Sequence, residues 1–171
     1  AARIAVGFVD PSAAEAALAE YRKRASRVPN GEQVAAQLAA DVDHVKRIVE
    51  AARTKPGDYA AQVTVANAYY DAGRWADAEA AYRRALALRG DDPNVITDCG
   101  ISMFQQNRPE EALKQFELAL SKNPKFVNAA LNGALVSAST GDKARARVWI
   151  DRLKALAPQH PAIPQLEARL K

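Results

Sequence analysis

The sequence is poor in the residue types that most enzyme and metal chemistry requires. Its 171 residues include one cysteine, Cys99, and two histidines, His44 and His160. One cysteine cannot form a disulfide within the chain. The sequence also has no glycine-rich phosphate loop, no paired-cysteine motif and no histidine spacing typical of a metal site. We therefore expect no catalytic centre, no metal and no cofactor.

Isolated serines and histidines do not change this expectation. His44 falls within a predicted helix, where a lone histidine is usually structural or solvated. Ser102, Ser137 and Ser139 fall on predicted helices with no histidine nearby in the repeat register to activate a hydroxyl group. The sequence therefore predicts a protein that is not an enzyme.

The net charge is small, because 24 lysines and arginines oppose 20 aspartates and glutamates and leave +4. Such an excess does not indicate binding to nucleic acid or to an anionic membrane surface. No aromatic residues alternate with basic ones, as they would on a surface that stacks bases. No run approaches the roughly 18 apolar residues that a membrane span needs. We expect neither a nucleic-acid partner nor a transmembrane segment. The basic residues near the C-terminal end are spread around a predicted helix, as on a solvated face: Arg145, Arg147, Arg152 and Lys154.

The first residues, AARIAVGFV, are apolar and are interrupted by Arg3. They are compatible with the remainder of a processed signal peptide or membrane anchor, or with an arbitrary boundary. The alanine and arginine usage favours a bacterial source, and the missing initial methionine favours an exported, periplasmic or membrane-tethered protein. We treat residues 1–10 as an apolar N-terminal segment and leave the compartment unassigned.

A period of 34 residues organises most of the chain. Gly73, Asn107 and Gly141 are separated by this step, and each residue type tolerates the left-handed backbone of a tight turn between helices. A repeat at a fixed step of this length is the sequence signature of stacked helical hairpins. We predict that these three residues form equivalent turns of consecutive helical hairpins.

The same step links small and large apolar residues that would pack between helices. Small residues that allow close helix approach recur at Ala78, Ala112 and Ala146. Large partners recur one helical turn later, at Tyr82, Phe116 and Ile150. A fourth set of positions ends the second helix of each hairpin: Pro56, Gly90, Pro124 and Pro158.

Apolar residues at three- and four-residue spacing predict helices between these marks, and strand patterns are absent. Asp92 with Pro93, and Asp142 after Gly141, are typical helix starts. The predicted helix pairs are 59–71 with 75–89, 93–105 with 109–122, and 127–139 with 142–157.

The stretches NAYYDAGRWADAEAAYRRALAL (Asn67 to Leu88) and NRPEEALKQFELALSKNP (Asn107 to Pro124) resemble the tetratricopeptide repeat family. The third repeat departs from the family pattern, with Lys143 in place of an aromatic residue and Leu153 in place of alanine. The resemblance implies an all-α fold, a right-handed α-solenoid of three helix-turn-helix repeats. The expected repeats are residues 59–92, 93–126 and 127–160.

Helices are expected on both sides of the three repeats, because a repeat array must cover its apolar ends. Residues 161–171 place Ile163, Leu166 and Leu170 on one side of a short helix and resemble the family's C-terminal capping helix. Residues 11–58 are expected to form N-terminal helices over 11–27 and 32–54, as a degenerate half-repeat or cap.

In this family the first helices of successive hairpins line a concave groove that contacts a peptide or helix. The resemblance therefore implies a partner groove that is apolar with an amide fringe: Val63, Asn67, Tyr70, Asp71, Asn94, Thr97, Ile101, Phe104, Gln105, Asn128, Leu131, Leu135 and Ala138. We expect Tyr70 and Phe104 to matter most, since rigid aromatics dominate binding hot spots. About half of the apolar members would equally serve as core residues.

Some family members capture a chaperone's C-terminal carboxylate with two lysines, two asparagines and an arginine. This chain keeps only Asn67 at the matching positions, and the others are Val63, Asp98, Asn128 and Asn132. A co-chaperone role of that type is therefore not expected.

Two functions follow. The first is a scaffold or adaptor that binds an apolar segment or an amphipathic helix of another protein. The second is a homo-oligomer or polymer, a filament-type subunit that stacks end to end and places residues 1–10 in a neighbour's groove. Partner binding is the commoner use of the fold, so we rank the adaptor first.

Overall fold

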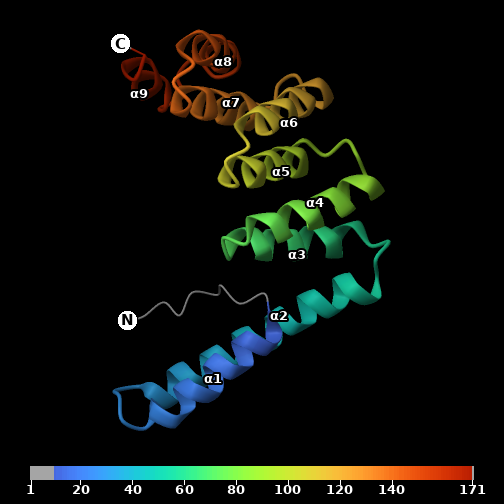
Figure 1. Cartoon of the computed structure of the whole chain (residues 1–171), viewed down its shortest axis with the longest axis vertical. Coiled ribbons are helices and arrows are strands. Elements are labelled where there is room, and N and C mark those ends of the chain that lie inside the picture. Colours follow the sequence, from blue (N-terminus) through green and yellow to red (C-terminus); the bar gives the residue numbers. More distant parts are fainter. Residues whose placement is uncertain (1–9, 171) are drawn as a thin grey trace. The chain divides into compact units, whose positions relative to one another are not determined.

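The computed structural model describes residues 10–170, in which every regular element is an α-helix (Figure 1). The prediction of an all-α chain is confirmed for this part. The predicted apolar segment over residues 1–10 lies, except for Asp10, outside the described residues. The helices are α1 (Pro11–Ala25), α2 (Gly31–Thr54), α3 (Tyr59–Asp71), α4 (Trp75–Leu88), α5 (Pro93–Gln105), α6 (Pro109–Lys122), α7 (Val127–Ser139), α8 (Lys143–Leu156) and α9 (Ile163–Ala168).

Contacts divide the chain into two compact units, one that ends at Ala78 and one that begins at Glu79. The boundary therefore falls inside α4. None of the helices described over residues 10–170 combines the length and the apolar character that a membrane crossing requires.

The three predicted turn residues all have left-handed backbones. The φ angle is 70° at Gly73, 60° at Asn107 and 78° at Gly141. In the first two turns the next residue's N–H donates to a carbonyl five residues back, at 2.9 Å for Arg74 to Tyr69 and 3.1 Å for Arg108 to Met103. This pattern satisfies carbonyls that a helix end leaves free. The turns predicted from the repeat are thus at equivalent bends.

Aspartate side chains begin several helices, because their oxygens satisfy free N–H groups of the first turn. The Asn94 N–H donates to Asp92 at 3.0 Å, and the Arg145 N–H donates to Asp142 at 2.9 Å. Helices α2, α4, α6 and α8 each end two residues before the predicted stop residue. The bounds of the six helices predicted over residues 59–157 differ from the observed bounds by one residue at most, whereas the short helix expected within residues 161–171 is confined to Ile163–Ala168.

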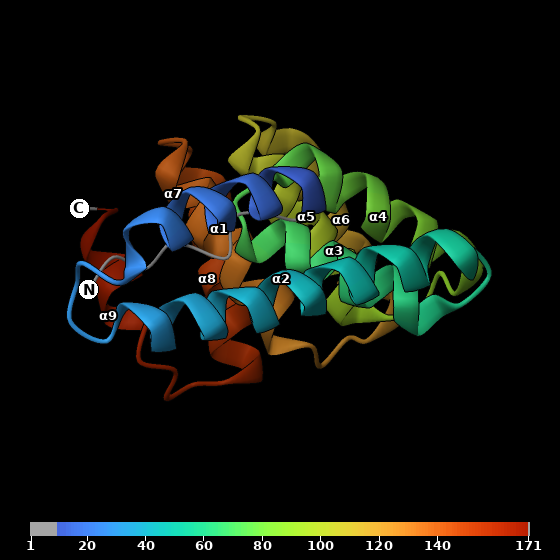
Figure 2. The same cartoon turned by 90° about the horizontal axis from the view of Figure 1, so that it is seen from below.

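In the first unit, α1 and α2 lie side by side (Figure 2). Ala14, Leu18 and Val42 form their buried core. A Cβ atom at Gly31 would lie 1.8 Å from the Ala25 carbonyl oxygen, so glycine permits the close return of the chain. The α2 helix then packs against α3, where the Gln62 amide donates to the Ala52 carbonyl at 2.9 Å.

In the second unit, each hairpin closes through small residues against large ones. Ala112 and Ala146 are fully buried, as predicted, and so are the side chains of Phe116 and Ile150. The rings of Phe116 and Trp149 meet edge to face, with centroids 6.5 Å apart. This packing joins α6 to α8 and fixes the positions of the first helices α5 and α7 that lie beside them.

Candidate partner-binding face

In the second unit, α5 packs against α7 as well as against α6. These two first helices hold nine of the thirteen residues that the sequence assigned to a partner groove. Asn94, Gln105, Asn128 and Leu135 are exposed, whereas Ile101, Phe104, Leu131 and Ala138 are half-buried.

Thr97 differs from these eight residues. It is only 2% exposed, and its hydroxyl has no hydrogen-bond partner among the described residues. The neighbouring Ile96 is fully buried, so this part of α5 turns toward the core. Thr97 therefore cannot contact a partner without a shift of the helix, and we remove it from the proposed contact set.

The other four candidates lie on α3, in the first unit. Asn67 and Asp71 are exposed, while Val63 and Tyr70 are half-buried. The Tyr70 ring meets Trp75 edge to face with centroids 5.1 Å apart. Tyr70 thus already packs against the first residue of α4, which limits the surface that it can offer to a partner.

Asp98 is the only residue of α5 and α7 that carries a charge at neutral pH. It is half-buried. Burial, helped by the negative charge of Asp92, raises the pKa of Asp98 from 3.8 to about 6. The sequence showed Asp98 at a groove position but could not show its environment.

Cys99, next in the chain, is buried. Burial first, and then the charge of Glu79, raise the pKa of its thiol to about 12. The thiol is therefore protonated at neutral pH and is a poor nucleophile.

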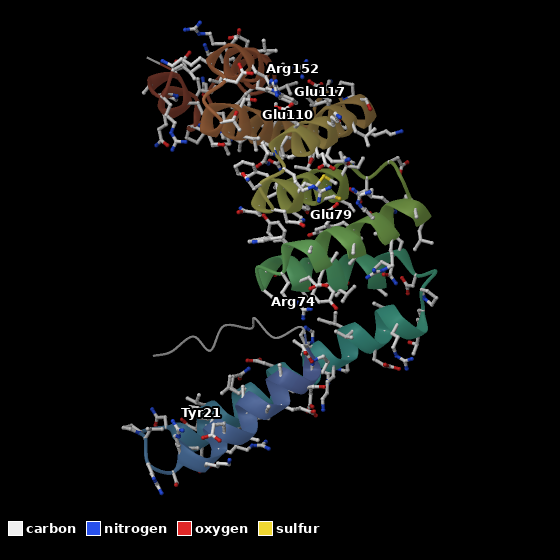
Figure 3. All side chains as sticks on the ribbon, in the orientation of Figure 1. Tyr21, Arg74, Glu79, Glu110, Glu117 and Arg152 are labelled. Carbon is white, nitrogen blue, oxygen red and sulfur yellow. The ribbon has the colours of Figure 1, made fainter. Side chains whose placement is uncertain are left out.

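A buried carboxylate joins α4 to the next hairpin, and sequence reasoning did not find it. Glu79, which is labelled in Figure 3, is 7% exposed. It accepts hydrogen bonds from Arg108 at 2.6 Å, Gln106 at 2.7 Å and Arg83 at 3.0 Å. Burial alone would raise the pKa of Glu79, but these donors together hold it below its ordinary value. Arg108 also binds Glu111 through two contacts of 2.6 Å. The network is structural.

Ion pairs also join the second helices α6 and α8. Arg145 lies 2.7 Å from Glu110, and Arg152 lies 2.5 Å from Glu117 (Figure 3). The Arg152 guanidinium stacks over the Trp149 ring, 4.7 Å from its centroid. Most side chains in these pairs are well exposed, so each pair adds little stability.

Residues 10–170 contain no group of three or more His, Cys, Asp or Glu side chains that could hold a metal ion. His44 is exposed, and His160 accepts a hydrogen bond from the Ala162 N–H at 3.2 Å. The Ser102 hydroxyl donates to the Asp98 carbonyl at 2.9 Å, a helix-internal bond. The exposure of His44 and the local hydrogen bonds of His160 and Ser102 are those of solvated or structural residues.

Comparisons with known proteins agree with the repeat. Two sequence profiles described as tetratricopeptide repeat match residues 57–123 and 103–170. Sixty residues are 38% identical to a peroxisomal targeting signal receptor of Eremothecium gossypii and cover 35% of this chain and 10% of the receptor. Another match of 101 residues is 29% identical to cellulose synthase operon protein C of Pseudomonas fluorescens, over 58% of this chain and 8% of that protein. The matches therefore span a tenth or less of these curated relatives.

The crystal structure of MamA has the same fold. It matches with a TM-score of 0.70 over 78% of this chain and 79% of that chain, at 17% sequence identity. Equivalent turns at 34-residue spacing, the packing of the hairpins and both profile matches lead to one conclusion. This chain belongs to the tetratricopeptide repeat family.

Proposed function

We propose that this chain is a non-enzymatic scaffold that holds a partner polypeptide against the first helices of its hairpins. Tetratricopeptide repeat proteins mediate protein–protein interaction. The proposal for this chain depends on where its apolar side chains remain accessible.

The observation that carries the proposal is the exposure of apolar residues on first helices whose core is already complete. On α7, Ala130, Ala134 and Val136 fill the core, while Leu135 remains 38% exposed and Leu131 half-buried. Leu131 and Leu135 are four residues apart and therefore share one face of α7. Neighbouring apolar side chains that the fold does not need are typical of an interaction surface.

Accessible apolar residues also occur on α5, in the same unit. Ile101 and Phe104 are half-buried and lie three residues apart. The amides of Asn94, Gln105 and Asn128 are on exposed residues and are able to bond with a partner's polar groups. A face of this kind fits the apolar side of an amphipathic helix or an extended apolar segment.

A matched pair of leucines tests the proposal. Leu135 on α7 and Leu118 on α6 are 38% and 40% exposed. Peptides are first selected from a random displayed library against the full chain, and their affinities are measured by calorimetry. Leu135→Asn should weaken binding roughly tenfold, because the contact loses about 1–2 kcal/mol of apolar burial. Leu118→Asn should leave the affinity unchanged. Equal effects of the two substitutions would remove the first-helix face from the account.

The alternative function, a filament-type subunit, is motivated by the apolar sequence of residues 1–10. In such a filament, residues 1–10 would bind in a neighbour's groove, and most of them lie outside the described range. The end-to-end contact between neighbours would involve α9. There Ile163 and Leu166 face inward, and the exposed residues include Gln165, Glu167 and Arg169. A polar outer side suits a cap better than a stacking surface. Sedimentation velocity of the full chain and of a chain without residues 1–10 separates the two: polymer lost on truncation supports the filament, and a monomer in both opposes it.

A further inference from the structure

Charge is segregated between the two kinds of helix. α5 and α7 contain no lysine, arginine or histidine, and their only charged residue at neutral pH is Asp98. α3 likewise contains a single charged residue, Asp71. The lysines and arginines of these hairpins lie on the second helices α6 and α8, as Arg145 and Arg152 do, or in the turn, as Arg108 does. A chain of net charge +4 therefore has first helices with negative charge only.

The carboxylate of Asp98 has no hydrogen bond or ion pair with any of residues 10–170. The hydroxyl of Ser102 donates to the Asp98 backbone carbonyl and not to the carboxylate. Among the described residues, the nearby charge that raises the pKa of Asp98 is that of Asp92, which repels the carboxylate. α7 packs against α5 and contributes no charge at all.

Glu79 provides the contrast within the same unit. That carboxylate accepts hydrogen bonds from three side chains, those of Arg108, Gln106 and Arg83. A partly desolvated carboxylate without such donors is unfavourable, since it loses water and gains nothing in return. Asp98 is therefore a group that the fold leaves uncompensated, on the helix face that we propose for a partner.

We propose that the partner segment is apolar and presents one lysine or arginine to Asp98. Ile101 lies three residues from Asp98 and thus on the same side of α5, and α7 beside it offers Leu131 and Leu135. The partner's apolar residues would cover these side chains, while its cation pairs with the carboxylate. This inference rests on the proposed function and specifies its partner.

The same charges disfavour other partners. An acidic side chain or a free C-terminal carboxylate would meet Asp98 and would find no cation on α5 or α7. The preference for a basic residue is therefore set by repulsion as well as by attraction.

The test is a double-mutant cycle on peptides selected from a random displayed library with the full chain. Selected sequences should share one lysine or arginine among apolar residues. Replacing that residue by glutamine should weaken binding to the wild-type chain roughly tenfold or more, as expected for a charge-assisted hydrogen bond. On the Asp98→Asn variant the same replacement should cost less than about twofold. Asp151→Asn, which removes an exposed carboxylate from the second helix α8, controls for the change in net charge and should behave like the wild type.

Two failures can be told apart. This inference is wrong if the selected peptides lack a shared basic residue. It is also wrong if replacing that residue lowers the affinity equally for the wild type and for Asp98→Asn. If such peptides still lose affinity with Leu135→Asn, the proposed function stands without it. If neither Leu135→Asn nor Asp98→Asn changes binding, the proposed function fails as well.

Discussion

Nη1 of Arg108 lies 2.6 Å from Oε2 of Glu79, a carboxylate whose side chain is only 9% exposed. Arg108 directly follows the left-handed turn residue Asn107, and Glu79 lies on α4. The pair therefore ties the turn of one hairpin to the second helix of the hairpin before it. Its carboxylate is far more buried than those of the Arg145–Glu110 and Arg152–Glu117 pairs, whose glutamates are 69% and 52% exposed.

Arg108→Ala should lower the free energy of unfolding by about 2 kcal/mol, because Glu79 would remain buried and lose its principal cation. Arg145→Ala is the matched control: its side chain is 39% exposed against 33% for Arg108, but its partner Glu110 is 69% exposed. That control should cost less than about 1 kcal/mol. Urea unfolding measures both. Equal losses would mean that burial of Glu79 does not matter.

Asp98 should make stability fall as the pH rises. Its pKa is raised from 3.8 to about 6 in the folded chain, so between these values the folded state holds a proton that the unfolded chain has released. The resulting decrease in the free energy of unfolding is absent below about pH 4 and grows up to about pH 6. Above that pH it is complete, at about 3 kcal/mol.

Asp98→Asn removes this titration. The stability of the variant relative to the wild type should therefore increase by about 3 kcal/mol between about pH 4 and about pH 7.5. Urea unfolding at several pH values checks the trend, with Asp151→Asn as the control for the loss of one negative charge. If the difference in free energy of unfolding between Asp98→Asn and the wild type does not vary with pH, the burial of Asp98 is contradicted.

Gly133→Ala should destabilise the third hairpin. A Cβ atom there would lie 2.2 Å from Cε3 of Trp149, which is itself only 2% exposed. We expect the free energy of unfolding to fall by about 1–3 kcal/mol, because the steric clash outweighs the intrinsic preference of helices for alanine over glycine. Gly57→Ala is the control, since nothing lies within 4 Å of its added atom. If Gly133→Ala is as mild as Gly57→Ala, the packing against Trp149 is looser than described.

The repeat made much of the fold predictable, because its features are local and recur. The turns at Gly73 and Asn107 require a left-handed backbone, and Ala112 and Ala146 require a small side chain. A residue requirement that returns every 34 positions is visible without coordinates.

The environment of each side chain was not predictable in this way. Glu79 and Arg108 are 29 residues apart and meet only once the hairpins have packed. Thr97 has the groove position of its repeat, yet the rotation of α5 buries it. A helix pattern places a residue on a face to within about one position, which does not distinguish Thr97 from Asp98. The scarcity of charge on the first helices was readable from the sequence and marks the candidate face.

The most direct test of the account is a methyl NMR titration of the full chain with a peptide selected as above. We predict shifts in the methyl groups of Ile101, Leu131 and Leu135, on the first helices, and none at Leu118 and Val148, which are exposed on the second helices. Shifts confined to Leu118 and Val148 would contradict the claim that the first helices bind the partner.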